Sequence, residues 1–143
     1  PTIRPDTIMR AGAEDDIYII DSKFYRYGSL DLSQTKGLPE ASSIVKQITY
    51  GSYVQSKYPD KKIYNIFILP YDAKSANAKL IEENDKNLAY IGEVSSGWES
   101  DKTYGHIYTF LVDLRYIVKI WNRMMHEEER ENLVDLVNAN MRI

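Results

Sequence analysis

Short apolar runs alternate with amphipathic stretches along the chain, and this pattern predicts one domain that mixes helices and strands. The apolar runs are rich in β-branched and aromatic residues and have the lengths of strands. They cover residues 6–10, 17–23, 62–70, 88–96 and 106–114. Apolar residues at three- and four-residue spacing predict helices over residues 38–58, 115–125 and 127–141, with a shorter helix near 74–83. No repeat, low-complexity tract or linker interrupts the order, so we expect a single α/β or α+β domain over residues 1–143.

The first two predicted strands form a hairpin. The polar, glycine-containing stretch AGAEDD at residues 11–16 separates them, so we expect them to pair in antiparallel fashion about a six-residue connection. The run KIYNIFILP, which ends on a proline, is typical of a buried central strand.

Composition supports a globular protein with a real core. The chain has 143 residues, of which 43% are hydrophobic, and it contains no cysteine for disulfides or thiolate metal sites. Its apolar runs are far shorter than the roughly 20 residues of a membrane-spanning helix. We therefore expect a soluble, cytoplasmic protein without a membrane partner. Because the chain starts at Pro1 without an initiator methionine, we also expect an amino-terminal segment or a separate recognition domain to be missing from it.

The charge balance narrows the possible partners. With 18 basic and 21 acidic residues, the formal net charge is -3. Sequence-independent affinity for nucleic acid comes mostly from clustered lysine and arginine. The domain is therefore not expected to hold DNA alone, and a recognition domain, a partner subunit or a second copy would assist it.

Three charged side chains are expected to meet at one end of the hairpin. Side chains alternate between the faces of a strand, so Asp21 and Lys23 share a face. Antiparallel pairing brings Asp6, at the start of the first strand, close to Asp21. Two adjacent carboxylates repel each other, and a divalent cation relieves that repulsion. Mg²⁺ prefers oxygen ligands, and the carbonyl of Ser22 could supply a further one. The Lys23 ammonium could then orient the attacking water or help to deprotonate it, and stabilise the negative charge that builds on the phosphate.

These residues carry a resemblance to a nuclease family. Pro5-Asp6 followed by Asp21-Ser22-Lys23 resembles the PD-(D/E)xK nuclease signature. The run IIDSKFY and the following helix with its Lys46-Gln47 pair are similar to the cleavage domains of type IIS restriction endonucleases such as FokI, and to LlaJI-like restriction endonucleases. The resemblance covers about a third of the chain, residues 4–53.

The resemblance implies a restriction-endonuclease-like fold, a central mixed β-sheet flanked by α-helices. It implies a Mg²⁺-dependent endodeoxyribonuclease that cuts double-stranded DNA, with Asp6, Asp21 and the Ser22 carbonyl as metal ligands. Lys23 would be the catalytic lysine, and Gln47 would support that lysine or the DNA backbone. Residues expected to contact DNA are Arg26, Lys46 and Tyr50. The family usually supplies another acidic residue from a helix before the Pro-Asp strand, which would lie upstream of residue 1.

Other interpretations remain open at this point. Asp21 and Lys23 could form a surface ion pair of little energetic value, and Gln47 and Tyr50 could belong to a solvated helix face. A non-catalytic assembly or DNA-docking module would keep the fold without metal binding, and an RNase or resolvase would share the chemistry but cut another substrate. His106 is expected to be a structural strand residue, and HEEER at residues 126–130 an acidic helix start.

Overall fold

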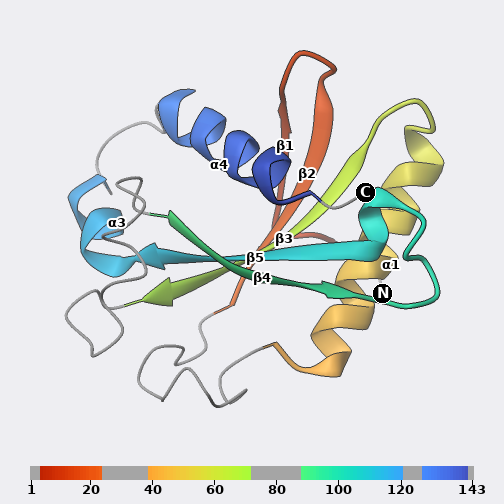
Figure 1. Cartoon of the computed structure of the whole chain (residues 1–143), viewed down its shortest axis with the longest axis horizontal. Coiled ribbons are helices and arrows are strands. Elements are labelled where there is room, and N and C mark those ends of the chain that lie inside the picture. The colour runs from red at the N-terminus through yellow and green to blue at the C-terminus, as the bar shows by residue number, and fades with distance from the viewer. Residues whose placement is uncertain (1–3, 24–38, 72–87, 121–126, 142–143) are drawn as a thin grey trace.

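The fold is built on a five-stranded mixed sheet with helices on both faces (Figure 1). The computed structural model describes residues 4–23, 39–71, 88–120 and 127–141. The strands are β1 (Thr7–Ala11), β2 (Asp16–Ser22), β3 (Ile63–Tyr71), β4 (Leu88–Ser95) and β5 (His106–Asp113), in the sheet order β1-β2-β3-β5-β4. The predicted α+β architecture, with a central mixed sheet flanked by helices, is confirmed.

The three inner strands are parallel, and the two edge strands run antiparallel to their neighbours. β2 pairs with β3 and β3 with β5 in parallel, whereas β1 pairs with β2 and β4 with β5 in antiparallel fashion. Parallel strands covered on both faces need apolar side chains on both faces, which explains the nearly continuous apolar run of β3. The run predicted to be a central strand does lie at the centre of the sheet. It continues through Pro70 to Tyr71.

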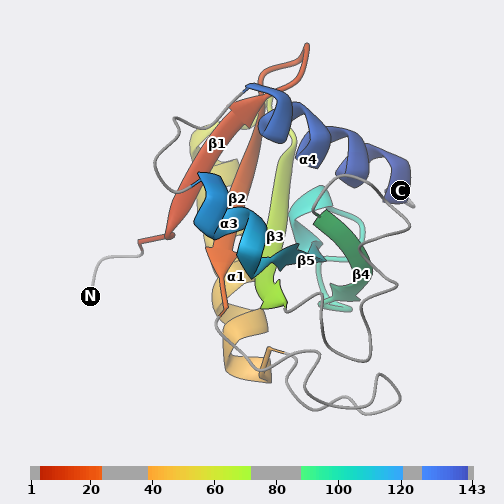
Figure 2. The same cartoon turned by 90° about the vertical axis from the view of Figure 1, so that its left-hand side faces the viewer.

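The helices cover opposite faces of this sheet (Figures 1 and 2). Helix α1 (Ala41–Lys57) packs Ile48 and Val54 against one face. Helices α3 (Leu114–Ile120) and α4 (Glu127–Asn140) lie on the other face, where α4 buries Leu133 and Val137. A short 3-10 turn, η1 (Thr103–Gly105), precedes β5. The helix expected near residues 74–83 lies outside the described residues. In the described part of the chain, no helix is both long and apolar enough to cross a membrane.

The β1–β2 connection is tighter than expected. β1 extends to Ala11 and β2 begins at Asp16, so four residues, not six, form the turn. Gly12 and Asp15 both have positive φ angles, of 82° and 53°. Such angles suit glycine and are tolerated by aspartate, which explains why the polar stretch can close in so few residues.

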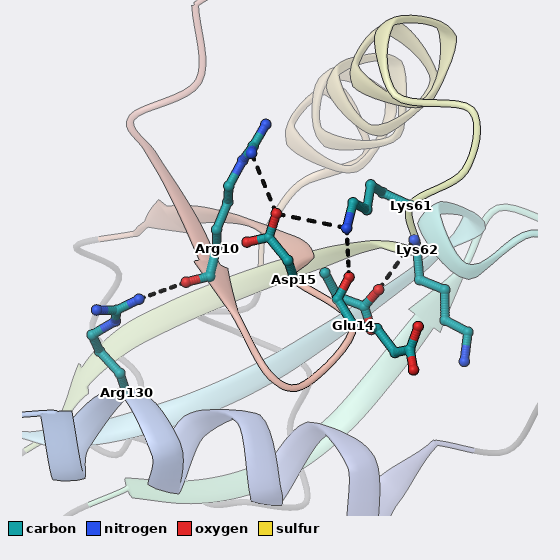
Figure 3. Close-up of polar contacts among 7 residues, drawn as sticks. Arg10, Glu14, Asp15, Lys61, Lys62 and Arg130 are labelled. Atoms are coloured by element: carbon teal, nitrogen blue, oxygen red, sulfur yellow. Dashed lines mark hydrogen bonds and ion pairs between the residues drawn. The ribbon is translucent and has the colours of Figure 1, made fainter.

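Contacts from both sides fix the hairpin tip (Figure 3). From α4, Arg130 donates a 2.5 Å hydrogen bond to the carbonyl of Arg10. From the chain just before β3, the Lys61 ammonium donates to the carbonyl of Glu14 and lies 3.6 Å from the Asp15 carboxylate. The hairpin is therefore held in register over its whole length, and this register sets the position of Asp6.

Helix α1 sits close to the sheet because Gly51 lacks a side chain. A Cβ atom at Gly51 would lie 2.6 Å from both Asn65 Nδ2 and Tyr104 Cβ. Asn65 is fully buried, and its amide donates a 2.7 Å hydrogen bond to the Tyr104 carbonyl. The neighbours cannot yield without disturbing that bond.

We expect Gly51→Ala to lower the free energy of unfolding by about 1–3 kcal/mol through overpacking. Chemical denaturation monitored by circular dichroism measures this change. Gly97→Ala is a less suitable comparison because of its positive φ angle, so the exposed Ser42→Ala on the same helix serves as the control. Equal stability of Gly51→Ala and Ser42→Ala would contradict the close seating of α1.

Candidate active site

The register of the hairpin places two carboxylates side by side. Thr7 pairs with Ile20, so the next position of each strand sets Asp6 opposite Asp21. The two side chains share a hydrogen bond, which is the main reason that the pKa of Asp6 is raised above 3.8. Partial burial and the negative charge of Asp21 raise the same pKa further. The structure thus brings together the two acids that the hairpin pattern predicted to be close.

Lys23 completes this cluster. Its Nζ atom lies 2.5 Å from Oδ2 of Asp21 and 5.7 Å from the centre of the Phe67 ring. The side chains of Asp21 and Lys23 are 4% and 15% exposed. The interpretation of this pair as an exposed surface ion pair is therefore wrong. Despite the close ammonium, Oδ2 of Asp21 accepts no well-oriented hydrogen bond from any residue that the structure describes.

A second lysine approaches the same carboxylates from α1. The charge of Lys46 lowers the pKa of Asp6, and the charges of Asp21 and Asp6 raise the pKa of Lys46 in return. The largest influence on Lys46 is a hydrogen bond with Tyr50, over whose ring its Nζ atom lies at 5.3 Å. Sequence reasoning treated Lys46 only as a DNA contact. Its position four residues before a tyrosine on a helix was the available signal that the ammonium would be held in place.

Gln47 and Tyr50 face the sheet and not the solvent. Gln47 is fully buried, and its Nε2 donates a 2.9 Å hydrogen bond to the carbonyl of Ile19 in β2. Tyr50 is 7% exposed and belongs to the core beneath α1. The interpretation of these residues as a solvated helix face is wrong. In this arrangement the Gln47 amide is closed off from the surface, while the roles predicted for Gln47 and Tyr50 in catalysis and DNA contact stay predictions. Arg26 lies outside the described residues.

The carbonyl of Ser22 lies on the side of β2 that faces β1. The N–H groups of Ile17 and Lys23 donate to the carbonyls of Lys62 and Ile68, which directs the backbone groups of Ser22 toward β1. The pairing of β1 with β2 ends at Thr7 and Ile20, so it does not include Ser22. Pro5, on the chain before β1, has no N–H with which to extend this pairing. The Ser22 carbonyl is therefore a backbone oxygen beyond the end of the β1–β2 ladder, next in the chain after Asp21.

The atoms that could bind a metal at the end of β2 are all oxygen atoms, which suit a hard cation such as Mg²⁺. The two carboxylates and the Ser22 carbonyl lie at the carboxyl end of β2, where ligands bind in sheets with parallel strands. Among the residues described, no group of three histidine, cysteine, aspartate or glutamate side chains gathers at one point. A cation here would be held by two carboxylates with a carbonyl, water and substrate oxygens.

His106 lies at the start of β5, away from this cluster. Its Nδ1 is 3.2 Å from the Glu93 carboxylate, and its Nε2 is 2.9 Å from the Ser100 carbonyl. Through these two contacts the His106 ring connects β4 with the loop before β5. This agrees with the structural role expected from the sequence. The acidic helix start is also confirmed, since Glu127, Glu128 and Glu129 form the first turn of α4.

The raised pKa of Asp6 predicts how stability depends on pH. A carboxyl whose pKa is higher in the folded than in the unfolded protein stabilises the fold fully below the unfolded value, near 3.8, and this contribution is lost as pH rises through the folded value. We expect Asp6→Asn, which keeps a hydrogen-bonding group without the charge, to have a higher Tm than the parent protein at neutral pH in EDTA. The difference should shrink on acidification toward pH 4. Thermal unfolding across this pH range measures it, and a pH-independent difference would contradict the coupling.

Comparison with known proteins identifies the family. Residues 1–96 of the 143-residue chain match the family model described as LlaJI restriction endonuclease. Neither the curated proteins nor the solved structures gave a match. The matched region contains the hairpin, α1 and β3, and so the whole cluster around Asp6 and Asp21. The chain belongs to the LlaJI restriction endonuclease family, which assigns it a restriction nuclease role with DNA as the substrate.

Proposed function

We propose that this chain is the Mg²⁺-dependent cleavage domain or subunit of a restriction enzyme, with a PD-(D/E)xK active site and a type IIS-like division between cleavage and recognition. One observation carries the proposal. The Asp6 and Asp21 carboxylates and the Lys23 ammonium converge at the carboxyl end of β2, where the chain continues from Asp21 to the Ser22 carbonyl.

The cation would be held by Asp6, Asp21 and the Ser22 carbonyl. The raised pKa of Asp6 reflects a carboxylate pair that a cation would stabilise in its charged form. Oδ2 of Asp21 is buried and lies 2.5 Å from the Lys23 ammonium, and a carboxylate oxygen is the kind of ligand atom that Mg²⁺ prefers. When bound, Mg²⁺ would supply Lewis-acid stabilisation of the phosphate charge.

Lys23 acts directly on the reacting phosphate in this proposal. Its Nζ atom lies over the Phe67 ring and beside the Asp21 carboxylate, so the ammonium is held before DNA arrives. Attack of water on the phosphodiester forms a new oxygen–phosphorus bond and breaks the bond from phosphorus to the 3′ oxygen. The 3′ oxygen takes up a proton and water loses one to solvent, which leaves a 3′-hydroxyl and a 5′-phosphate.

Lys46 and the residues beneath it position the cluster. The Lys46 ammonium, held by Tyr50, lies near both carboxylates and is suited to hold a neighbouring DNA phosphate. Gln47 fixes α1 to β2 at Ile19, two residues before Asp21, and so acts as a positioning residue. Arg26 belongs to the DNA contacts proposed from the sequence alone.

The proposal is tested by incubating supercoiled plasmid with the chain in Mg²⁺ and in EDTA. We expect Mg²⁺-dependent nicking, with cleavage of both strands only where a second copy or a recognition partner is present, since one site cuts one strand. End-labelling should find the phosphate on the 5′ side. Nicking that is unaffected by EDTA, or a clear preference for RNA or for a four-way junction over plasmid duplex, would contradict the proposal.

A further inference from the structure

A groove runs between the edge strand β1 and helix α1, on the same side of the sheet as the carboxylate cluster. It encloses about 510 Å³. Its lining residues are Ile8, Arg10, Ile17, Tyr53, Val54 and Lys57, closed at one end by Tyr58. We call it the β1–α1 groove.

The groove exposes apolar surface that the fold does not use. Ile8, Tyr53 and Tyr58 are 52%, 48% and 43% exposed. Of the seven large apolar side chains that are exposed in the described part of the chain, these three gather here. Exposed apolar side chains scattered singly need no explanation, but a cluster in a groove indicates a binding surface.

Cations accompany the aromatic rings. The Lys57 Nζ lies 5.5 Å from the centre of the Tyr53 ring, and the Arg10 guanidinium lies 4.9 Å from that of Tyr58. No acidic residue lines the groove. At its rim, the single carboxylate of Asp15 is shared by Arg10 and Lys61 (Figure 3). The groove is thus locally positive on a chain whose net charge is -3.

The groove and the proposed active site lie along the same two elements, α1 and the β1–β2 hairpin. Helix α1 and strand β1 both run from the end of the sheet that holds Asp6 toward the hairpin tip (Figure 2). Lys46 near the carboxylates and Lys57 in the groove lie on the same helix, about 16 Å apart along its axis at 1.5 Å per residue. A polymer that leaves the site along α1 reaches the groove without crossing the sheet.

We propose that the β1–α1 groove binds a single DNA strand with unpaired bases. Arg10 and Lys57 contact its phosphates, and bases stack on Tyr53 and Tyr58. Each of these half-exposed rings has a cation over one face, and a base would stack on the opposite face. Unpaired bases have faces available for such stacking, whereas the faces of paired bases are covered in a duplex. A second copy of this chain has a net negative charge and would also be attracted by the cations. Its binding would not require aromatic rings with a face available for stacking. Only the continuation of the bound strand into the cleavage site rests on the proposed function.

The test is fluorescence anisotropy with a labelled oligothymidine in EDTA, so that binding is measured without cleavage. Tyr53→Leu should weaken binding by about five- to a hundred-fold, and Tyr53→Phe should restore it, because stacking needs the ring and not the hydroxyl. Lys57→Ala should reduce the slope of log affinity against log salt by about 0.7, the value for one phosphate contact on a single strand.

Two exposed residues away from the groove give matched controls, Trp98→Leu for the aromatic change and Lys102→Ala for the charge change. Circular dichroism and thermal unfolding confirm that each variant is folded.

Each outcome decides the proposal. Loss of binding in Tyr53→Leu but not in Trp98→Leu, with a labelled duplex much less affected, supports it. Parent-like binding by Tyr53→Leu, equal loss of duplex and single-strand binding, no binding by the parent chain, or a concentration-dependent dimer that the groove variants abolish would overturn it. If the groove variants lose binding while the parent chain fails to cut plasmid in Mg²⁺, the groove stands and the proposed nuclease function fails.

Discussion

Asp21→Asn is expected to lower the rate of Mg²⁺-dependent DNA cleavage at least a thousand-fold, or about 4 kcal/mol in the activation free energy. The substitution keeps the size of the side chain and removes the charge. Asp21 faces Asp6 on one side and Lys23 on the other, so its loss removes a proposed cation ligand and the partner that holds the ammonium. Lys23→Met should have an effect of similar size, because methionine keeps an unbranched side chain near Phe67 and removes the charge that is proposed to act on the phosphate.

The loop before η1 offers a matched control for this pair. Asp101 and Lys102 also form an aspartate–lysine ion pair, at 2.7 Å, but both side chains are exposed. Asp101→Asn and Lys102→Met make the same chemical changes at the opposite end of the parallel strands, and we expect them to leave cleavage unchanged. Cleavage that persists in Asp21→Asn, or that falls equally in Asp101→Asn, would exclude the cluster at β2 as the active site. Isothermal calorimetry with Mg²⁺ separates loss of the cation from loss of the chemical step.

The alternation of side chains explains why part of this site was predictable. A hairpin fixes which residues lie opposite each other, and period-two alternation fixes which share a face, so Asp6, Asp21 and Lys23 could be brought together from their positions alone. The order of strands and helices followed from periodicity in the same way. The tight turn was less predictable, because it depends on Asp15 adopting a positive φ angle.

The environment of the site was not predictable, because it depends on how α1 docks. Whether Gln47 and Tyr50 face solvent or sheet is set by the rotation of the helix, and both are polar enough to suit either side. Gly51, Asn65 and Tyr104 come from three different elements of the chain and together fix that rotation. The approach of Lys46 to the carboxylates is a consequence of the same docking.

Two prolines shape the end of the sheet at the site. Pro5 has no N–H to extend the pairing of β1 with β2 beyond Thr7 and Ile20. The register of β2 with β3 sets Pro70 where its missing N–H would meet the Lys23 carbonyl. On the β3 side the Lys23 N–H still donates to the Ile68 carbonyl, so the ladder ends at Lys23. In the proposed enzyme, neither Pro5 nor Pro70 donates to the backbone oxygens at the end of β2, while the strand before them stays paired.

Gln47 provides the second decisive test, since it can be changed without opening the active site. Its amide lies in the core between α1 and β2 and holds the Ile19 carbonyl. Gln47→Ala leaves a cavity and removes this bond, so we expect a loss of about 2–4 kcal/mol in the free energy of unfolding. Gln47→Met fills nearly the same volume. It also removes the Oε1 atom, which has no hydrogen-bond partner among the described residues. We therefore expect it to lower the free energy of unfolding by less than about 1.5 kcal/mol.

The methionine variant separates positioning from folding. If Gln47 acts only through packing, Gln47→Met should cut DNA at the parent rate. If it fixes β2 so that Asp21 and Lys23 hold their geometry, the variant should remain folded and bind DNA normally in EDTA, yet cut about ten-fold more slowly at saturating DNA and Mg²⁺. We expect the second result, because Ile19 lies only two residues before Asp21 on the same face of β2. A parent-like rate in a stable Gln47→Met would limit Gln47 to a structural role, while the assignment of Asp21 and Lys23 would be unaffected.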